Sequence, residues 1–393
     1  MDLVETYGEV AETLLDYVEN DRTDLLDETM RVPAATYLDP ALFEREMDVV
    51  FKRLPLMMAL TIELPNPGDY KAMDALGLPL LITRGKDGKA RAFLNVCSHR
   101  AAQVTPDGTG NCSRFSCPYH GWTYNSEGKL IGVAEAGKFG AVNRTAYGLT
   151  ELPCEEAAGL IFVILTPGLP MDLPGFLGGM LDDLAALKLD TCHYLGNREI
   201  FGANWKVTFD GYVEAYHFAA AHSQTVNPRT HSNLMKYDYF GPHMRIAWAQ
   251  RSIGDLRELD RSEWGTRENR GYDFTRTVFP NMSIFLAPEM GQIAQLLPGP
   301  GPAENRTILT YICREPPADE AAHAAVMEMC RFFGDVTYEE DYLLGLKVQR
   351  GLESGARDHV IFGRNECGNQ HYHRWLDHYL EQASATTSGT PPA

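Results

Sequence analysis

Residues 97–124 read CSHRAAQVTPDGTGNCSRFSCPYHGWTY, and this stretch decides how the first part of the chain folds. It contains the pair Cys97-x-His99, then seventeen intervening residues, then the pair Cys117-x-x-His120. Thiolates and imidazoles are ligands for both iron and zinc. Two such pairs in two short loops therefore indicate a metal site.

Two metals compete for this set of ligands. Structural zinc sites usually separate the members of a pair by two or more residues, because a single intervening residue makes tetrahedral chelation awkward. A Cys-x-His pair fits better when its two members bind different iron atoms, as in a Rieske [2Fe–2S] centre. The spacing thus favours a Rieske cluster on Cys97, His99, Cys117 and His120, with zinc and unrelated core residues as the alternatives.

The neighbouring residues agree with a cluster. Gly121 permits close approach of the backbone to a sulfide, and Trp122 is expected to shield one side. We expect the outer nitrogens of both histidines near the surface, where a partner group can reach them. Cys112 lies between the two pairs but outside the pattern, and we interpret it as a bystander.

A known family carries the same motif. Residues 92–104 (AFLNVCSHRAAQV) and 117–130 (CPYHGWTYNSEGKL) closely resemble the Rieske domain of the large (α) subunit of Rieske non-haem iron oxygenases. One departure is local: the family often has Arg-Gly after His-Arg, where this chain has Ala101-Ala102. We expect that change to alter loop packing and to leave the ligands unaffected.

A second constellation lies in residues 204–222, NWKVTFDGYVEAYHFAAAH. Non-haem Fe(II) sites use two histidines and one carboxylate, so His217 and His222 are candidate ligands. The pattern predicts a helix, on which Asp210, Glu214 and His217 share a face while His222 lies about 140° away. Both histidines reach one iron only if that helix is distorted or ends, and we predict a π-bulge near residues 219–221.

The resemblance extends to this stretch and implies roles for its residues. Asn-Trp-Lys, an acidic residue and Tyr-His-x4-His look like the catalytic iron motif of the same oxygenases, with His217 and His222 as ligands. Glu214 matches the bridging carboxylate, which in the family links a Rieske histidine of the neighbouring subunit to the iron site. Here that implies Glu214 between His120 and His217, with Asp210 as a supporting catalytic residue.

The third iron ligand is expected in residues 335–350, DVTYEEDYLLGLKVQR. In the family an acidic residue or Gln precedes the ligating Asp, and a Gln follows about eight residues later. Asp341 matches this pattern and is our prediction. Glu339 and Asp335 remain alternatives, because an exposed helical face also explains acidic residues here.

The organisation of the chain indicates an α+β fold. Short β-rich runs between turn signals predict a small all-β Rieske domain over residues 38–165. Residues 1–37 and 166–381 form the catalytic domain, with an antiparallel sheet against a long helix over about 318–353 (helix-grip-like). The polar, Pro-containing segment 382–393 is predicted to be disordered.

Composition limits the partners and the compartment. The chain has 35 Lys and Arg against 53 Asp and Glu, a formal net charge of −18, which argues against nucleic acid or an anionic membrane. No apolar run approaches the roughly 20 residues that span a bilayer, and residues 1–20 do not resemble a signal peptide. Eight dispersed cysteines favour a reducing cytoplasm.

The resemblance implies the terminal oxygenase of a multicomponent system. No dinucleotide-binding G-x-G-x-x-G follows a strand, so electrons from NAD(P)H must come through a separate reductase, with or without a ferredoxin. The family also implies a head-to-tail homotrimer. A pure electron carrier and a zinc-binding interaction protein are the competing classes.

The substrate is less constrained. Hydroxylation of an aromatic compound, in aromatic hydrocarbon catabolism, is the first expectation. Oxidative N- or O-demethylation, or oxidation of a quaternary ammonium compound, is the second. We expect Phe218, Met235 and Phe285 to line the pocket, and an aromatic box for a cation is possible. The box residues would be Trp248, Trp264 and Tyr272, for which a place in the core is the favoured alternative, while His371, His373 and His378 are interpreted as packing or interface residues.

Overall fold

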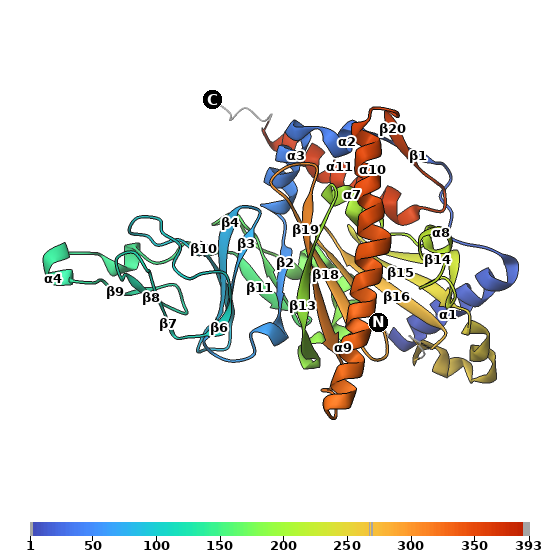
Figure 1. Ribbon diagram of the computed structural model, residues 1–393, viewed down its shortest axis with the longest axis horizontal. Helices are drawn as coiled ribbons and strands as arrows, with labels where there is room; N and C mark the ends of the chain where they lie inside the picture. Colours follow the sequence, from blue (N-terminus) through green and yellow to red (C-terminus); the bar gives the residue numbers. More distant parts are fainter. Residues whose placement is uncertain (1–2, 267, 269, 388–393) are drawn as a thin grey trace. The chain divides into compact units, whose positions relative to one another are not determined.

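The computed structural model describes residues 3–266, 268 and 270–387. The chain divides into two compact units, one of residues 51–176 and 187–191 and the other of the remaining residues (Figure 1). The first unit begins at residue 51 and not at the predicted residue 38. Pro40–Glu46 forms helix α3, with Asp39 accepting from the Ala41 amide at its N-cap, and this helix belongs to the second unit.

The first unit is built from antiparallel strands, as predicted. One sheet has the order β10-β5-β4-β3-β6, and two smaller sheets have the orders β11-β12-β2 and β7-β8-β9. The strands are β2 (Leu56–Leu60), β3 (Asp69–Ala75), β4 (Leu78–Arg84), β5 (Ala90–Leu94), β6 (Gly108–Asn111), β7 (Arg114–Ser116), β8 (Thr123–Asn125), β9 (Leu130–Gly132), β10 (Glu151–Leu152), β11 (Cys154–Ala157) and β12 (Leu160–Val163). Cys97, Cys117 and Trp122 belong to its hydrophobic core.

The second unit centres on a seven-stranded antiparallel sheet of order β13-β19-β18-β17-β16-β15-β14. Its strands are β13 (His193–Gly202), β14 (Thr230–Phe240), β15 (His243–Gln250), β16 (Tyr272–Val278), β17 (Met282–Leu286), β18 (Gly291–Pro298) and β19 (Asn305–Cys313). A separate two-stranded sheet pairs β1 (Met30–Pro33) with β20 (His359–Phe362). The predicted α+β class with an antiparallel sheet is confirmed.

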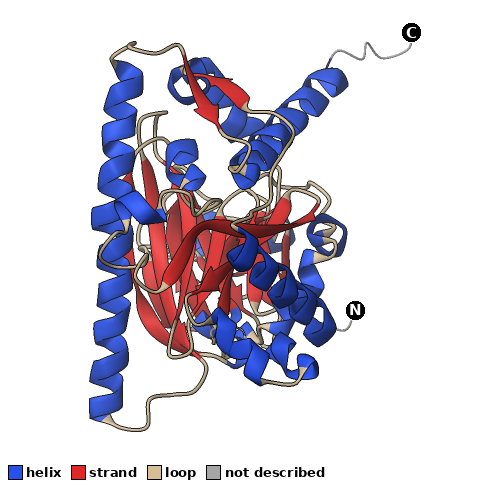
Figure 2. Cartoon of the chain, turned by 90° about the vertical axis from the view of Figure 1, so that its right-hand side faces the viewer, coloured by secondary structure: helices blue, strands red, loops and turns tan. Residues whose placement is uncertain are grey.

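A long helical rod runs along one side of this sheet (Figure 2). It consists of α9 (Glu320–Val336), a π-helical turn (Thr337–Tyr342) and α10 (Leu343–Glu353). Val326 and Cys330 of α9 pack into the cluster that includes Leu309 and Tyr311 of β19. Because a π turn widens the helix locally, it changes the direction of the side chains that it carries.

The remaining helices are divided between the two units. They are α1 (Leu3–Asn20), α2 (Ala35–Leu38), α4 (Ala136–Phe139), α5 (Leu173–Leu177), α6 (Met180–Ala186), α7 (Trp205–Asp210), α8 (Phe218–Ala221) and α11 (Cys367–Thr387), with a second π turn at Met47–Phe51. Short 3₁₀ turns occur at Thr61–Glu63, Arg144–Ala146, Leu189–Thr191, Ile253–Glu258 and Arg261–Thr266. None of the helices in the described residues is long and apolar enough to cross a membrane.

Two predictions about helices were wrong. Helix α11 continues through residue 387, so 382–387 are helical where disorder was predicted, and 388–393 lie outside the described residues. The predicted single helix over 204–222 is two short helices, α7 and α8, joined by residues 211–217. Gly211 follows α7, and glycine propagates a helix poorly. The π-bulge near 219–221 is therefore not needed and does not form.

A buried charge network ties α6 to the sheet. Asp183 accepts hydrogen bonds from Arg245 Nη1 at 2.5 Å, Arg276 Nε at 2.6 Å and the Tyr7 hydroxyl at 2.7 Å. Burial raises the pKa of Asp183, but the two guanidinium groups outweigh it and hold that pKa below its usual range. The pKa of Asp183 is thus lower in the folded chain than in the unfolded chain, where it is near 3.9. The resulting stability is present above that pH and is lost as pH falls through the folded pKa.

Asp183→Asn is expected to lower the free energy of unfolding at pH 7 by about 3 kcal/mol, because two buried cations lose the carboxylate that they share and keep one carboxylate each, Asp238 for Arg245 and Glu268 for Arg276. The difference from wild type should shrink below about pH 4, where Asp183 of the unfolded wild-type chain takes up a proton, and vanish once pH falls through the lower folded pKa. Urea unfolding across this pH range measures both effects. The exposed neighbour Asp182, changed to Asn, is the matched control, and a gap independent of pH would contradict the assignment.

Candidate metal centres

The cluster site is formed by two loops with the same backbone pattern. In the first, the Cys97 amide donates to Ala102 O at 2.8 Å and the Ala101 amide donates to Cys97 O at 2.9 Å. In the second, the Cys117 amide donates to Trp122 O at 2.8 Å and the Gly121 amide to Cys117 O at 3.0 Å. Each loop thus folds back on its cysteine and presents the cysteine and histidine on the same side.

The tight turn in each loop needs a left-handed residue. Gly121 has φ of 66°, which glycine adopts without strain. Ala101 occupies the equivalent place with φ of 59°, a conformation that costs alanine roughly 1 kcal/mol. Of the two alanines at which this chain departs from the motif that it resembles, Ala101 therefore falls where the backbone favours glycine. Both alanines leave the loop closed around Cys97.

The four side chains have the chemistry that a [2Fe–2S] cluster requires. Both cysteines are buried, and the rings of His99 and His120 are 4.7 Å apart between centroids. Among the described residues, Nδ1 of His99 is buried with no hydrogen-bond partner, which is costly unless it binds a ligand. Two buried thiols and an imidazole nitrogen without a partner fit a Rieske cluster.

Trp122 and Tyr124 complete the surroundings of the cluster site. The indole of Trp122 stacks on the His99 ring at 5.0 Å with an interplanar angle of 10°, as expected for a shield. The Tyr124 hydroxyl lies 3.2 Å from Cys97 Sγ and accepts from the Ser98 amide at 3.0 Å. Burial raises the pKa of Tyr124 to about 12, so this hydroxyl keeps its proton at neutral pH and can donate to the thiolate. Sequence analysis did not identify Tyr124.

Tyr124→Phe is expected to lower the reduction potential of the cluster, because a hydrogen bond to sulfur stabilises the added electron. Protein-film voltammetry measures the change, and visible absorption reports whether the cluster is retained. Tyr70→Phe is the control, since this tyrosine packs on Phe115 in the same unit. An unchanged potential in Tyr124→Phe would contradict the assignment.

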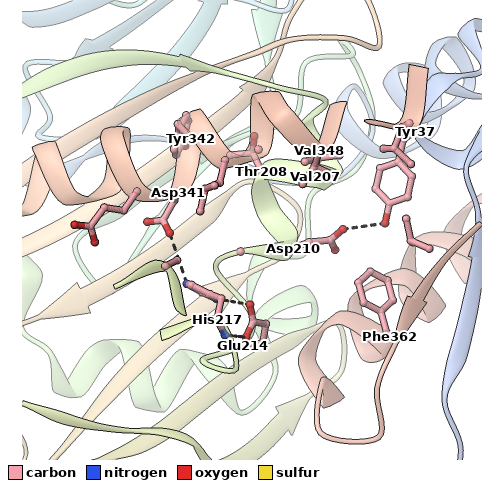
Figure 3. Close-up of a pocket in the computed structure, with 17 residues that line it drawn as sticks. Tyr37, Val207, Thr208, Asp210, Glu214, His217, Asp341, Tyr342, Val348 and Phe362 are labelled. Carbon is pink, nitrogen blue, oxygen red and sulfur yellow. Dashed lines mark hydrogen bonds and ion pairs between the residues drawn. The ribbon is translucent and has the colours of Figure 1, made fainter. Parts of the chain in front are cut away.

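The second centre is formed by three residues from two elements. His222 Nε2 lies 3.1 Å from His217 Nε2 and 3.0 Å from Asp341 Oδ1, while Asp341 Oδ1 lies 3.6 Å from His217 Nε2. Among the described residues this is the one group of three His, Cys, Asp or Glu side chains whose ligand atoms converge within 4.8 Å. Figure 3 shows Asp341 directed at His217 from the helical rod.

Local backbone structure explains how the two histidines meet. His217 and His222 flank the four-residue helix α8 as its N-cap and C-cap. His222 has φ of −103° and ψ of 32°, outside the helical range, so its side chain leaves the helical phase. The π turn supplies Asp341 from the other side. The distortion that we predicted between the histidines is thus a helix end.

The protonation of the two rings fits a cation. Glu214 Oε1 contacts His217 Nδ1, and Glu340 Oε2 lies 2.6 Å from His222 Nδ1. With a cation bound at the Nε2 atoms, Glu214 and Glu340 would each accept the Nδ1 proton of the ring that they face, because the cation takes the place of any proton that Asp341 holds on Nε2. The two Nε2 lone pairs then face each other beside the Asp341 carboxylate. That arrangement suits an Fe(II) ion held by two histidines and one aspartate.

The backbone beside His217 holds the Glu214 carboxylate, which in turn contacts the His217 ring. Its Oε2 accepts from the Tyr216 and His217 amides, the latter at 3.1 Å. The structure therefore places Glu214 against the first histidine of the pair. The predicted link from Glu214 to His120 of another subunit stays a prediction.

Glu340 is a candidate orienting residue, which sequence analysis used only as the acidic residue that precedes Asp341, with an exposed helical face as the alternative. It accepts from the Thr225 hydroxyl at 2.6 Å as well as from the ring of His222. Burial lowers the pKa of His222, but Asp341 and Glu340 outweigh it and hold that pKa above its ordinary value. The two carboxylates thus favour positive charge at this ring, which a bound cation would supply.

Glu340→Ala is expected to weaken iron binding at the second centre about 10- to 100-fold, because an unsupported imidazole loses its orientation and tautomer. Iron titration of the apoprotein measures the affinity. Glu339→Ala, one residue away and exposed, should bind iron like wild type. Equal affinities in the two variants would rule out an orienting role for Glu340.

Asp210 does not share a face with Glu214 and His217, because α7 ends at Asp210. Its Oδ2 accepts from the Tyr37 hydroxyl at 2.9 Å, and its Oδ1 lies 3.0 Å from His373 Nε2. Figure 3 shows the Asp210 carboxylate directed at Tyr37. Its catalytic role therefore stays a prediction, and His373 packs against it, in agreement with the packing interpretation.

Two cavities adjoin the second centre. The larger cavity, about 260 Å³, is lined by Tyr37, Val207, Thr208, Asp210, Gly211, Glu214, His217, Ala221, Glu340, Asp341, Tyr342, Leu344, Gly345, Val348, Leu352, Val360 and Phe362 (Figure 3). The aromatic pocket, about 140 Å³, is lined by Gly211, Tyr212, Glu214, Ala215, His217, Phe218, His222, Val226, Ile246, Trp248, Thr275, Ser283, Phe285, Gln292, Ala294, Phe333, Val336, Thr337 and Asp341.

The predicted substrate pocket is partly correct. Phe218 and Phe285 line the aromatic pocket, but Met235 is buried, with its sulfur accepting from the Ala215 amide at 3.0 Å. The favoured core assignment is confirmed for Tyr272 and Trp264, because Tyr272 packs against α1 with Trp264 beside it, and the aromatic box does not form. Strand residues alternate between faces. Tyr272 therefore points to α1, whereas Thr275 on the same strand lines the aromatic pocket.

Comparison with known proteins agrees with this division into two centres. Residues 181–382 match the family model for the catalytic domain of the ring-hydroxylating alpha subunit. Residues 55–146 match the model for the Rieske [2Fe–2S] domain.

The relatives act on several kinds of molecule. The glycine betaine monooxygenase oxygenase subunit of Chromohalobacter salexigens is 31% identical over 53% of this chain and 45% of its own length. The anthranilate 1,2-dioxygenase large subunit of Burkholderia cepacia is 31% identical over 50% and 48%. The matched part thus spans about half the length of these two relatives. The carnitine monooxygenase oxygenase subunit of Escherichia coli (strain K12) is 27% identical over 89% of this chain and 93% of its own length.

Solved structures share the fold. A quaternary ammonium Rieske monooxygenase superposes with a TM-score of 0.78 at 22% identity, covering 89% of this chain and 95% of that chain. Naphthalene 1,2-dioxygenase from Rhodococcus sp. gives a TM-score of 0.74 at 21% identity, covering 95% and 98%.

Proposed function

This chain belongs to the ring-hydroxylating alpha-subunit family and carries a Rieske [2Fe–2S] domain, and from that premise we propose that it is the terminal oxygenase of a multicomponent system. The observation that carries the proposal is the pair of imidazole Nε2 atoms, 3.1 Å apart, that face each other beside Asp341. Bound Fe(II) would supply activation of O₂ for the oxidation of a small organic substrate, with electrons arriving through the cluster.

The side chains around the second centre have separate tasks in this proposal. Glu214 and Glu340 hold the Nδ1 protons of the two histidines, which leaves both Nε2 atoms free to bind the metal. Phe218, Trp248 and Phe285 form an apolar wall of the aromatic pocket, which keeps water away from the reacting substrate. Asp210, hydrogen-bonded to Tyr37, is proposed to support Glu214 from the larger cavity.

Electrons must come from another protein in this proposal. We propose an NAD(P)H-dependent reductase, with or without a ferredoxin, because no dinucleotide-binding fingerprint follows a strand in the sequence. The net charge of −18 suits a basic partner. The eight free cysteines are consistent with a reducing, cytoplasmic location.

We propose a homotrimer in which the cluster of one subunit serves the iron site of the next. Each of the two units has exposed apolar side chains. They support a homotrimer, because a neighbouring copy of the chain would cover them. On the cluster unit these are Tyr119 and Phe139. On the other unit they are Tyr216 together with Leu344 and Val348, of which the last two line the larger cavity.

Mixed assembly tests this arrangement. Chains with Cys117→Ser lack a cluster ligand, and chains with Asp341→Ala lack an iron ligand, so each pure assembly should be inactive. Co-assembled chains should recover part of the activity if electrons cross between subunits. An inactive mixture, shown by mass spectrometry to contain both chains, would refute the inter-subunit route.

The substrate class has two candidates. Hydroxylation of an aromatic compound is the first expectation from the family, and the anthranilate relative supports it. Oxidation of a quaternary ammonium compound is the second, and it is supported by a carnitine relative that matches over almost its whole length. Substrate-dependent oxygen uptake with a surrogate reductase, across aromatic acids, methoxyarenes and quaternary amines, distinguishes the two. Uptake with none of them would count against an oxygenase.

A further inference from the structure

The wall of the aromatic pocket contains neither Lys nor Arg. Every lining residue belongs to the described part of the chain. The adjoining centre carries three carboxylates, from Glu214, Asp341 and Glu340, against the two positive charges of one Fe(II). The formal balance is therefore negative, which disfavours an anionic group on a ligand.

One polar side-chain atom in this wall, Gln292 Oε1, has no hydrogen-bond partner among the described residues. Gln292 of β18 lies opposite Phe285 of β17, which lies opposite Thr275 of β16, so the three side chains share the face that borders the pocket. Gln292 Nε2 lies 3.1 Å from Thr337 Oγ1. The Oε1 atom of the same amide is buried.

The orientation of the Gln292 amide follows from its neighbour. The Thr337 hydroxyl donates its only proton to Phe333 O at 2.9 Å, so it can only accept from Gln292. The NH₂ group must therefore face Thr337, which leaves Oε1 as the atom without a partner. A buried acceptor in this state destabilises the empty pocket. The terminal torsion of glutamine is soft, so Oε1 can turn to a donor that enters.

We propose that Gln292 recognises a hydrogen-bond donor on a neutral or cationic substrate, such as an alcohol or an amine, and that the pocket disfavours carboxylates. This inference rests on the proposed oxygenase function, since it concerns the pocket beside the iron. Gln292 is thus a specificity-determining residue, while Phe218, Trp248 and Phe285 contact the apolar part of the molecule.

Anaerobic calorimetry on the iron-loaded full chain tests the proposal without turnover. The probes are two matched pairs, choline with propyltrimethylammonium and benzyl alcohol with ethylbenzene, together with benzoate. The donor-bearing member of at least one pair is expected to bind about tenfold tighter, the value of one hydrogen bond. Benzoate is expected to bind more weakly than benzyl alcohol.

Two variants test whether the carbonyl of Gln292 causes the preference for hydrogen-bond donors. Gln292→Met keeps the volume but has no carbonyl acceptor, and it should reduce the donor preference to within about twofold. Gln292→Glu keeps an acceptor and should retain the preference, because any added charge affects both members of a pair equally. Visible absorption and thermal unfolding show whether each variant is folded.

Several outcomes would overturn the proposal: no binding of any probe, no donor preference in wild type, a preference that survives Gln292→Met, or benzoate binding as tightly as benzyl alcohol. Oxygen uptake measured on the same probes is a separate result. A donor preference without substrate-dependent uptake would refute the oxygenase function and leave the recognition by Gln292 standing.

Discussion

Replacing Asp341 with alanine should lower the iron content from about three to about two atoms per chain while the visible absorption of the cluster stays intact. The reason is the position of its carboxylate, 3.0 Å from His222 Nε2 and 3.6 Å from His217 Nε2. Without it, two neutral imidazoles remain to hold a divalent ion. Turnover should fall by more than about 100-fold, since even orienting residues around metals contribute 10- to 100-fold.

The control for this change is the exposed Glu339, two residues earlier in the same π turn. Glu339→Ala should retain the full iron content and activity. Full retention of iron in Asp341→Ala would instead point to Glu339 or Asp335 as the ligand. Metal analysis alongside visible spectroscopy separates loss of the single iron from loss of the cluster.

Glu214→Gln is expected to keep both metal centres and to slow electron transfer between them by more than about 100-fold. A carboxylate offers two acceptor oxygens, and in this structure Oε1 and Oε2 both face N–H donors of the His217 segment. An amide replaces one of these oxygens with a donor. It can therefore no longer accept from His217 and from a second imidazole together.

Single-turnover stopped-flow spectroscopy measures this transfer as the oxidation of a pre-reduced cluster in the presence of O₂ and substrate. Glu339→Gln is the matched control, because it removes the same charge from an exposed site nearby. Unchanged single-turnover rates in Glu214→Gln, with both metals present, would show that Glu214 is not the bridge.

The candidate ligands were the part of the site that sequence analysis predicted in most detail. The spacing of Cys97, His99, Cys117 and His120 carries chemical information by itself, because few metal sites tolerate a Cys-x-His pair. The structure brings His217, His222 and Asp341 together, although Asp341 is more than a hundred residues away in sequence. Family resemblance, and not periodicity, selected it.

Backbone geometry was predicted less well. An apolar, alanine-rich pattern suggested one helix over 204–222, but Gly211 and the contacts of the following loop end it at Asp210. Because the helix ends at Asp210, Glu214 lies outside it and the two residues do not share a helical face as predicted. A pattern of residue types does not show where tertiary contacts interrupt a helix.

Glu340 illustrates a second limit. It precedes Asp341 directly, and the two carboxylates contact opposite nitrogens of one ring, Glu340 at Nδ1 and Asp341 at Nε2 of His222. These two contacts require both the π turn, which carries Glu340 and Asp341, and the non-helical backbone of His222 at the end of α8. Neither is visible in residue spacing, so sequence alone assigns Glu340 to an exposed face.

Metal and sulfide analysis of the anaerobically purified chain tests the central claim most directly, namely that one polypeptide holds two different iron centres. The account predicts a coloured protein with about three iron atoms and about two acid-labile sulfides per chain. A colourless protein that contains zinc and no labile sulfide would contradict it.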